Sequence, residues 1–185
     1  MLTEDIRDYV RQACEAKANI LGPSFFGRHI VVVADCAVQL AQELKGDQEI
    51  VEIASYLHDI SAALDPATLP RHPRASADLA TTLLRERGYP DDCTGRVADA
   101  IASHVDPLQL NAGTVEAVCL SNADAVSRIL QPAYWLYFAV AIRRLEFEEA
   151  RVWLRSLVER EWSLMIPHAQ RLCGAHYDTL MTLLT

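Results

Sequence analysis

Residues 47–59 read DQEIVEIASYLHD, and this stretch is the clearest indication of the fold class. The apolar residues that recur in it at three- and four-residue steps are Ile50, Ile53, Ala54 and Leu57. This spacing is that of one face of an amphipathic α-helix. The apolar run ends at His58-Asp59, so we predict a packed helix with a histidine and an aspartate at its C-terminal end. Taken alone, such a pair is usually a cap or a solvated helix end.

Helical patterning continues along most of the chain, with breakers between the helices. Pro66 and Pro70 interrupt the pattern, so we predict a loop over 61–71, and a second loop is expected over 106–113. Thr114 suits the N-cap of the helix that follows. The other helical segments are expected at 24–44, at 73–87, after 89–92 to near 104, at 114–130, from 134, at 144–164 and at 167–184. No run alternates as a β-strand does, so the predicted fold is all-α.

Composition and charge limit the class of protein. The chain has 185 residues, of which 51% are hydrophobic and 23% charged, enough for a compact unit with a sizeable core. Lysine and arginine number 17 against 25 acidic residues, a formal net charge of −8. A phosphate backbone repels so acidic a chain, so we expect no nucleic-acid polymer as a partner. Metal cations suit this charge.

Features of secreted and membrane proteins are not evident in the sequence. No stretch approaches the roughly 18 uncharged apolar residues of a bilayer-spanning helix, so no membrane partner is expected. Residues 1–8 read MLTEDIRD, which lacks the basic and then apolar pattern of a secretory signal. The five cysteines are scattered without a Cys-x-x-Cys pair, which favours reduced, packed thiols. We therefore expect a cytoplasmic protein.

Several histidines and one aspartate fall at helix ends or on inward faces. His29 lies in the apolar arc of its helix, His72 at the start of the third helix and His104 at the end of the fourth. Asp124 lies mid-helix among apolar residues, where a carboxylate is unfavourable unless paired, and an ion pair with Arg128 would satisfy it. Each residue alone has an ordinary structural explanation. Together, imidazoles and carboxylates are the ligands that suit Zn²⁺, Mn²⁺ or Fe²⁺.

The order of these residues resembles the H…HD…D signature of the HD superfamily of metal-dependent phosphohydrolases. The segments that carry the resemblance are GRHI at 27–30, ASYLHDI at 54–60 and SNADA at 121–125. Two further segments fit, because HPRASA at 72–77 resembles H-x-x-x-[SG]-A and IASH at 101–104 resembles the I-x-x-H ending of many members. The resemblance covers roughly residues 20–130.

The resemblance implies an all-α HD-domain helical bundle over residues 1–130, with C-terminal helices at 131–185 packed on it in the same compact unit. It also implies a set of metal ligands: His29, His58, Asp59, His72, His104 and Asp124. The first metal would take His29, His58, Asp59 and Asp124, and a second would add His72 and His104, with Asp59 bridging both. Alternatively, His72 and His104 would surround a single metal or contact phosphate. One or two divalent ions per chain are expected (Mn, Fe, Ni, Zn or Mg), their identity left open by the ligand types.

The activity that the resemblance implies is hydrolysis by a metal-activated water at His58 and Asp59, the expected catalytic residues. The substrate would be a phosphomonoester, phosphodiester or phosphoanhydride of a small nucleotide-like molecule. The arginines that flank the ligands and could contact its phosphate are Arg28, Arg71, Arg74 and Arg128. For each of them a solvated or helix-pairing role is the alternative. Arg71 and Arg74 are the strongest candidates, because they bracket His72 beside a helix N-terminus.

Other functions stay open at this point. The same six ligands loaded with two irons serve an oxygenase in a side branch of the superfamily, and a non-catalytic metal- or nucleotide-binding module is a third possibility. Many members follow the HD dipeptide with Gly-Lys, whereas this chain has Ile60-Ser61, which counts against a cyclic-dinucleotide substrate. Residues 131–185 carry no recognisable chemistry. Their aromatic residues indicate a helical cap or a homodimer interface, with a substrate lid as the alternative.

Overall fold

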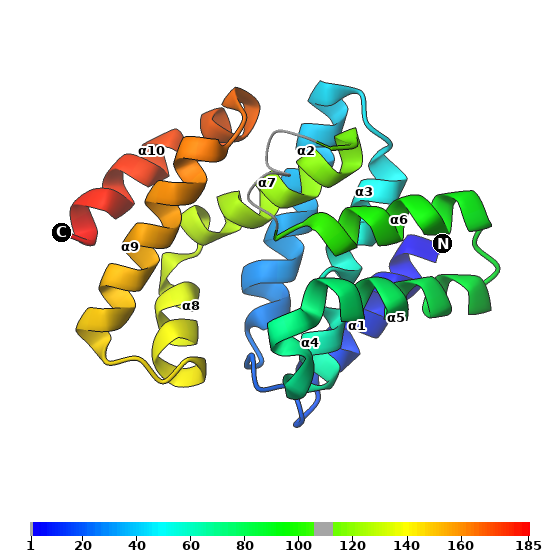
Figure 1. Ribbon diagram of the computed structural model, residues 1–185, viewed down its shortest axis with the longest axis horizontal. Coiled ribbons are helices and arrows are strands. Elements are labelled where there is room, and N and C mark those ends of the chain that lie inside the picture. Colours follow the sequence, from blue (N-terminus) through cyan, green and yellow to red (C-terminus); the bar gives the residue numbers. More distant parts are fainter. Residues whose placement is uncertain (1, 106–112) are drawn as a thin grey trace.

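The computed structural model describes residues 2–105 and 113–185 (Figure 1). The longer helices are α1 (Leu2–Glu15), α2 (Val31–Leu44), α3 (Gln48–Leu57), α5 (His72–Glu86), α6 (Asp91–Ser103), α7 (Val115–Leu130), α9 (Phe147–Leu164) and α10 (Pro167–Leu183). The shorter elements are the π-helical turns η1 (Phe26–Ile30) and η4 (Phe138–Ile142), the 3₁₀ helix η2 (Pro66–Arg71), α4 (Ile60–Leu64) and α8 (Pro132–Tyr137). Every regular element in the described ranges is helical, which confirms the predicted all-α class.

Short helices occupy one of the two segments that the sequence predicts as loops. The predicted loop over 61–71 is wrong, because α4 and η2 occupy it. Pro66 does not break η2 but begins it, at a position where a missing N–H is harmless, and the Asp65 side chain caps the same turn by accepting from the Ala67 N–H. The predicted loop over 106–113 falls almost entirely outside the described residues. The predicted cap at Thr114 is confirmed, since its hydroxyl accepts from the Ala117 N–H.

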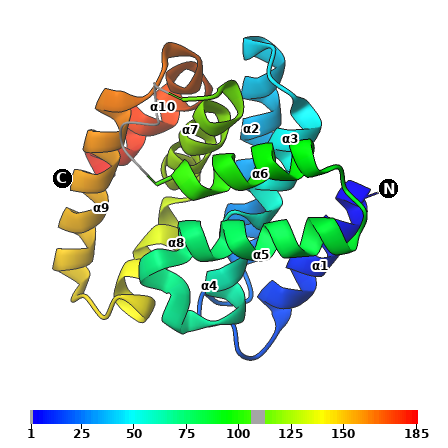
Figure 2. The same cartoon turned by 45° about the vertical axis from the view of Figure 1, so that its right-hand side comes forward.

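Helix α7 runs through the middle of the molecule (Figure 1). Eleven of its 16 residues are buried, so nearly every face packs against another element. It contacts α2, α3, α6, α9 and α10, while α5 and α6 lie side by side and cover α3 (Figure 2). The small residues Ala117, Ala123 and Ala125 let these neighbours approach closely. A side chain on α7 is therefore held from several sides, which is a rigid setting for a buried polar group.

The C-terminal helices stand beside this bundle rather than apart from it. Helix α10 packs on α7 and α2, and α9 packs on α7, α8 and η4. In Figure 1 they form the edge of the molecule opposite α5 and α6. Buried Asn122 on α7 fastens them, because its Oδ1 accepts from the Ile166 N–H at 3.1 Å and its Nδ2 donates to the Val118 carbonyl at 2.9 Å.

None of the helices in the described ranges combines the length and the apolar character that crossing a membrane requires.

The Asn122 link gives a stability prediction. Asn122→Ala removes the acceptor of the Ile166 N–H, so we expect the free energy of unfolding to fall by about 1–3 kcal/mol in urea denaturation. Thr179→Ala on α10 is the control, because its exposed hydroxyl bonds only to the preceding turn, and it should stay within about 0.5 kcal/mol of the wild type. Equal stabilities of the two variants would contradict the role of Asn122.

Candidate metal centre and its cavity

The six predicted ligand residues come from five separate places in the fold and converge on one point. His29 lies in η1, His58 caps the C-terminus of α3, and Asp59 follows it before α4. His72 begins α5, His104 follows the end of α6, and Asp124 lies in the middle of α7. The rings of His58 and His104 lie 5.0 Å apart and those of His72 and His104 lie 5.2 Å apart, measured between centroids. Their role as ligands stays a prediction, but the structure brings all six together.

Each histidine is oriented by a bond through its Nδ1 atom. The Nδ1 atoms of His58, His72 and His104 lie 2.7, 2.8 and 2.6 Å from the carbonyl oxygens of residues three positions earlier in the chain. A carbonyl can only accept, so each Nδ1 carries hydrogen, and in the neutral imidazole the lone pair of Nε2 is left available to a metal. His29 Nδ1 lies 3.0 Å from the Ser127 hydroxyl, which itself donates to the Asp124 carbonyl at 2.7 Å and so must accept from the imidazole. Such partners fix ring orientation and tautomer in metal sites.

Asp59 lies between two pairs of histidines. Its Oδ2 atom is 3.3 Å from His29 Nε2 and 3.4 Å from His58 Nε2. Its Oδ1 atom is 3.2 Å from His72 Nε2 and 3.8 Å from His104 Nε2. Each carboxylate oxygen therefore faces its own histidine pair, as a ligand shared between two ions would. Asp124 adds its Oδ1 atom to the first group, 3.6 Å from His29 Nε2.

Two hydroxyl groups hold the ends of α4 and α5 that carry Asp59 and His72. The Ser76 hydroxyl donates to the Ser61 hydroxyl at 3.0 Å and accepts from the Ser61 N–H, and the Ser61 hydroxyl in turn lies 3.3 Å from the His72 carbonyl. Ser61 stands where many members of the resembled superfamily have lysine. In this chain it fastens together the two helix starts beside the histidine–aspartate cluster.

The cluster fits a divalent cation. Asp59 Oδ1 and Asp124 Oδ1 are buried and accept no hydrogen bond from any described residue. The Nε2 atoms of His29 and His58 lie 3.0 Å apart, so two lone pairs would face each other unless a proton or a cation lies nearby. Within the described ranges, the groups His29–His58–Asp59 and Asp59–His72–His104 each have ligand atoms within 4.8 Å of one another. Neutral imidazoles and carboxylates are suitable ligands for first-row divalent ions.

The charges in the cluster depend strongly on one another. Burial opposes the negative charge of Asp59, yet His58 and His72 hold its pKa well below the usual value. Burial likewise opposes a charge on His58, but the Asp59 carboxylate raises the pKa of His58 to about 9. Burial lowers the pKa of His29, and burial together with His58 lowers the pKa of His104 to about 4. The raised pKa of His58 thus favours a positive charge beside the Asp59 carboxylate.

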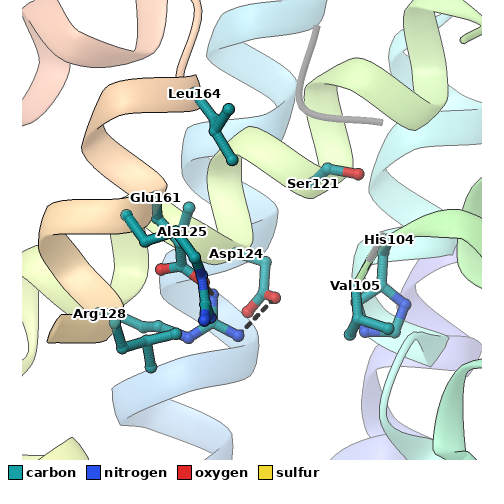
Figure 3. A pocket seen from close by; sticks show the side chains of 10 residues that line it. His104, Val105, Ser121, Asp124, Ala125, Arg128, Glu161 and Leu164 are labelled. Carbon is teal, nitrogen blue, oxygen red and sulfur yellow. Dashed lines mark hydrogen bonds and ion pairs between the residues drawn. The ribbon is translucent and has the colours of Figure 1, made fainter. Parts of the chain in front are cut away.

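Arg128 connects the cluster to the C-terminal helices (Figure 3). Its guanidinium lies 2.8 Å from Asp124 Oδ2 and 3.3 Å from Glu161 Oε1 on α9, and it covers the ring of Trp135 at 4.9 Å. Burial opposes the charge of Asp124, but Arg128 and the histidines lower its pKa to about 2. Arg128 lies closer to Asp124 than to Glu161. At Glu161 the effect of burial is therefore larger than the effect of Arg128, and it raises the pKa of Glu161 to about 7. The ion pair with Asp124 is the one that the helical spacing indicated.

Two cavities open beside the cluster. The larger, about 560 Å³, reaches Asp59, His72, His104, Asp124 and Arg128 and is otherwise lined mainly by apolar and aromatic side chains. A volume of this size suits a small molecule. The smaller, about 170 Å³, lies against His104, Asp124, Arg128 and Glu161 (Figure 3).

The four predicted phosphate-contacting arginines take different positions. Arg128 lines both cavities. Arg28 is exposed and donates to the Gln131 side chain at 3.3 Å, outside these cavities. Arg71 and Arg74 are exposed, and the larger cavity is lined without them. Their role in binding substrate stays a prediction, and the positions favour Arg128 over the other three.

The sequence analysis missed several residues at this site. Ser127 follows Asp124 by one helical turn, a spacing that could have suggested a partner for the same cluster. Glu161, Phe138, Arg143 and Trp153 also lie against the cavities, but they are far from the histidine motifs in the sequence. Nothing in the spacing of these four residues indicates their place.

The fold and the cluster define an all-α domain with a buried histidine–aspartate centre of the kind that binds divalent metals. The family model described as HD domain matches residues 26–129, more than half of the chain. The chain therefore belongs to the HD-domain family.

Similar proteins extend this finding. The chain is 33% identical over 162 residues to ribonuclease Y of Enterococcus faecalis, a match that covers 78% of this chain and 29% of that protein. A match to ribonuclease Y of Desulforudis audaxviator is 34% identical and covers 54% of this chain and 18% of that protein. The chain thus spans less than a third of the length of these curated relatives.

Solved structures share the fold over nearly the whole chain. Bacillus subtilis YpgQ in complex with ADP is similar with a TM-score of 0.74 and 20% identity, over 98% of this chain and 93% of that one. A predicted HD superfamily hydrolase from an uncultured Thermotogales bacterium is similar with a TM-score of 0.60 and 25% identity, over 93% and 91% of the two chains.

The geometry predicts the metal content of variants. Asp59→Ala removes the carboxylate that faces both histidine pairs, so bound divalent metal should fall to background in elemental analysis after anaerobic purification. His72→Ala should lose one ion per chain and keep the helical circular dichroism spectrum of the wild type. His176→Ala, an exposed histidine of α10, is the control and should keep the full metal content. Unchanged metal content in Asp59→Ala would contradict the site.

The raised pKa of Glu161 predicts a pH-dependent stability. Its ordinary pKa of 4.5 rises to about 7 on folding, so the folded state binds more protons in this range and stability falls as pH rises from about 4.5 through 7. Glu161→Gln has no carboxyl group that ionises at this position, so it lacks this pH-dependent loss of stability. Its free energy of unfolding relative to the wild type should therefore increase between pH 5 and pH 8, by on the order of 2–3 kcal/mol.

Urea denaturation of metal-free protein at the two pH values measures this difference. Glu159→Gln is the control, because Glu159 lies on the same helix but is exposed in an ion pair with Arg155. An identical pH dependence for Glu161→Gln and the wild type would contradict the raised pKa.

Proposed function

We propose that this protein is a metal-dependent phosphohydrolase that cleaves a phosphomonoester, phosphodiester or phosphoanhydride of a small nucleotide-like substrate. The observation that carries the proposal is the position of Asp59, with one carboxylate oxygen toward each histidine pair, at the edge of a substrate-sized cavity. Membership of the HD-domain family supports a hydrolase, and one of the similar solved structures is itself described as a predicted HD superfamily hydrolase.

The proposed metal ligands form two groups that share Asp59. His29, His58 and Asp124 would hold one divalent ion with it, and His72 and His104 a second. When bound, such ions lower the pKa of water and polarise phosphoryl oxygens, which is the chemistry that phosphate-ester hydrolysis needs. The protein's own part is to keep the histidines in one tautomer through their Nδ1 bonds and to keep both aspartates ionised.

Arg128 is the proposed phosphate contact. It already neutralises Asp124 from the side of the cavity, and it lies in the wall of both cavities. Its planar guanidinium can offer two parallel N–H groups to phosphoryl oxygens, which lysine cannot do. Its Nε atom is buried without a hydrogen-bond partner among the described residues.

A small substrate fits the cavity and the charge better than a polymer. The formal net charge of −8 opposes a long phosphate backbone, and the cavity of about 560 Å³ has the volume of a small-molecule site. A structure with the same fold holds ADP. The ribonuclease Y relatives favour RNA instead, but the chain spans less than a third of their length. RNA therefore belongs in the test as the competing substrate.

The test is hydrolysis of a panel of nucleoside mono- and diphosphates, ribose 5-phosphate and an RNA oligonucleotide, with Mn²⁺ under anaerobic conditions. We expect phosphate release from the nucleoside mono- and diphosphates. Asp59→Ala should lower kcat/KM by more than 100-fold, beyond the roughly 10–100-fold effect of removing an outer-shell partner, which Ser127→Ala should show. The control His176→Ala should match the wild type. Full activity of Asp59→Ala, turnover only with O₂, or cleavage of RNA alone would contradict the proposal.

A further inference from the structure

One wall of the larger cavity is a continuous row of aromatic rings from the C-terminal part of the chain. The ring of Trp135 on α8 lies 5.3 Å from that of Phe138 on η4, and Phe138 lies 6.3 Å from Trp153 on α9, measured between centroids. All three rings line the cavity. Trp135 is only 7% exposed, whereas Phe138 and Trp153 are half-buried and keep part of their surface free.

An arginine covers each end of this row. The guanidinium of Arg128 lies 4.9 Å from the ring centre of Trp135, and that of Arg143 lies 4.7 Å from the ring centre of Trp153. Both arginines line the same cavity. Arg128 is tied to Asp124 and Glu161, whereas Arg143 is exposed and makes no ion pair with any residue in the described ranges. The Arg128 end of the row is therefore the one beside the histidine–aspartate cluster.

The same cavity is also lined by Asp59, His72 and His104. A molecule in this cavity thus meets the candidate metal ligands and Arg128 at one end, and free aromatic surface with an unpaired guanidinium at the other. Aromatic faces and arginine planes are the groups on which nucleobases stack. A phosphate without an aromatic group would leave the Phe138 and Trp153 surfaces in contact with water.

We propose that Phe138, Trp153 and Arg143 form a slot for a nucleobase, which selects nucleosides and nucleotides over phosphate esters that lack a base. The proposal rests on the proposed function for the placement of the phosphate at Arg128 and the histidine–aspartate cluster. The base lies against the exposed surfaces of Phe138 and Trp153, beside the Arg143 guanidinium that covers part of the Trp153 ring. The C-terminal segment thus supplies specificity to a site whose candidate ligands all lie before residue 125.

A second aromatic pair in the same segment shows what a purely structural contact looks like here. Trp162 and Tyr177 stack at 4.1 Å between centroids with an angle of 11° between their planes, so each fills the face of the other. Neither residue lines the larger cavity. Phe138 and Trp153, at 6.3 Å and 33°, are further apart and inclined. Trp162 therefore provides a matched control for Trp153 on the same helix.

Adenosine and ribose are the test ligands, because they differ by the base and neither carries a phosphate that the protein could hydrolyse. Isothermal titration calorimetry uses the full chain as purified with its metals. We expect adenosine to bind at least tenfold more tightly than ribose, and Trp153→Leu to weaken adenosine binding about tenfold. Trp153→Phe retains a stacking face and should stay within about threefold of the wild type. Trp162→Leu should leave the affinity for adenosine unchanged.

The outcomes separate this proposal from the proposed function. Equal affinity for adenosine and ribose, including no measurable binding of either, overturns the base slot even where the hydrolysis panel shows turnover. Equal effects of Trp153→Leu and Trp162→Leu also overturn it. A preference for adenosine that depends on Trp153 supports the slot even where no phosphate ester is hydrolysed, and then it is the hydrolase proposal that fails.

Discussion

The carboxylate of Asp59, placed between two pairs of histidines, is the constraint on which the rest of the structure depends. A carboxylate removed from water is strongly unfavourable unless positive charge or donors surround it. Here the surrounding groups come from η1, α3, α5 and α6, so all four elements must meet at one point. The carbonyl and hydroxyl partners of the Nδ1 atoms then decide which nitrogen of each ring points inward. The Oδ1 atom of this carboxylate still accepts no hydrogen bond from any described residue.

Arg128 extends this charge balance into the C-terminal helices. One guanidinium serves two carboxylates, and the closer one, Asp124, keeps its charge while the pKa of Glu161 rises. Helix α9 is therefore linked to α7 by a buried polar contact as well as by apolar packing. A cation held by Asp124 Oδ1 would compete with Arg128 for the charge of that carboxylate. Part of the positive charge of Arg128 would then become available to Glu161 or to a bound phosphate.

The sequence predicted what depends on local pattern and missed what depends on tertiary packing. The amphipathic periodicity of 47–59 corresponds to α3, and the cap at Thr114 corresponds to the start of α7. Both could be predicted because each pattern involves residues that are close together in the sequence. The short helices at 60–71 were not predicted, because one or two turns are too short to show a periodicity. In addition, a proline can begin a helix as well as break one. The histidine motifs pointed to one cluster because their order and local contexts are distinctive. Trp153 and Glu161 carry no such context, and only the packing of α9 on α7 brings them to the cavity.

The end of the family match separates the candidate metal ligands from the aromatic row of the cavity. The match ends at residue 129, just after Arg128, and so contains every candidate metal ligand and the arginine beside them. The aromatic wall begins at Trp135, outside that match, and continues on α9. The candidate metal ligands in the cavity wall thus belong to the region that the family model matches, whereas the aromatic row does not. Helices α8 and α9 also touch the centre, because the ring of Trp135 lies 5.1 Å from that of His29 and Arg128 lies 3.3 Å from Glu161. In the base slot that we propose, the choice of substrate accordingly depends on Phe138, Arg143 and Trp153, which follow all the candidate metal ligands in the sequence.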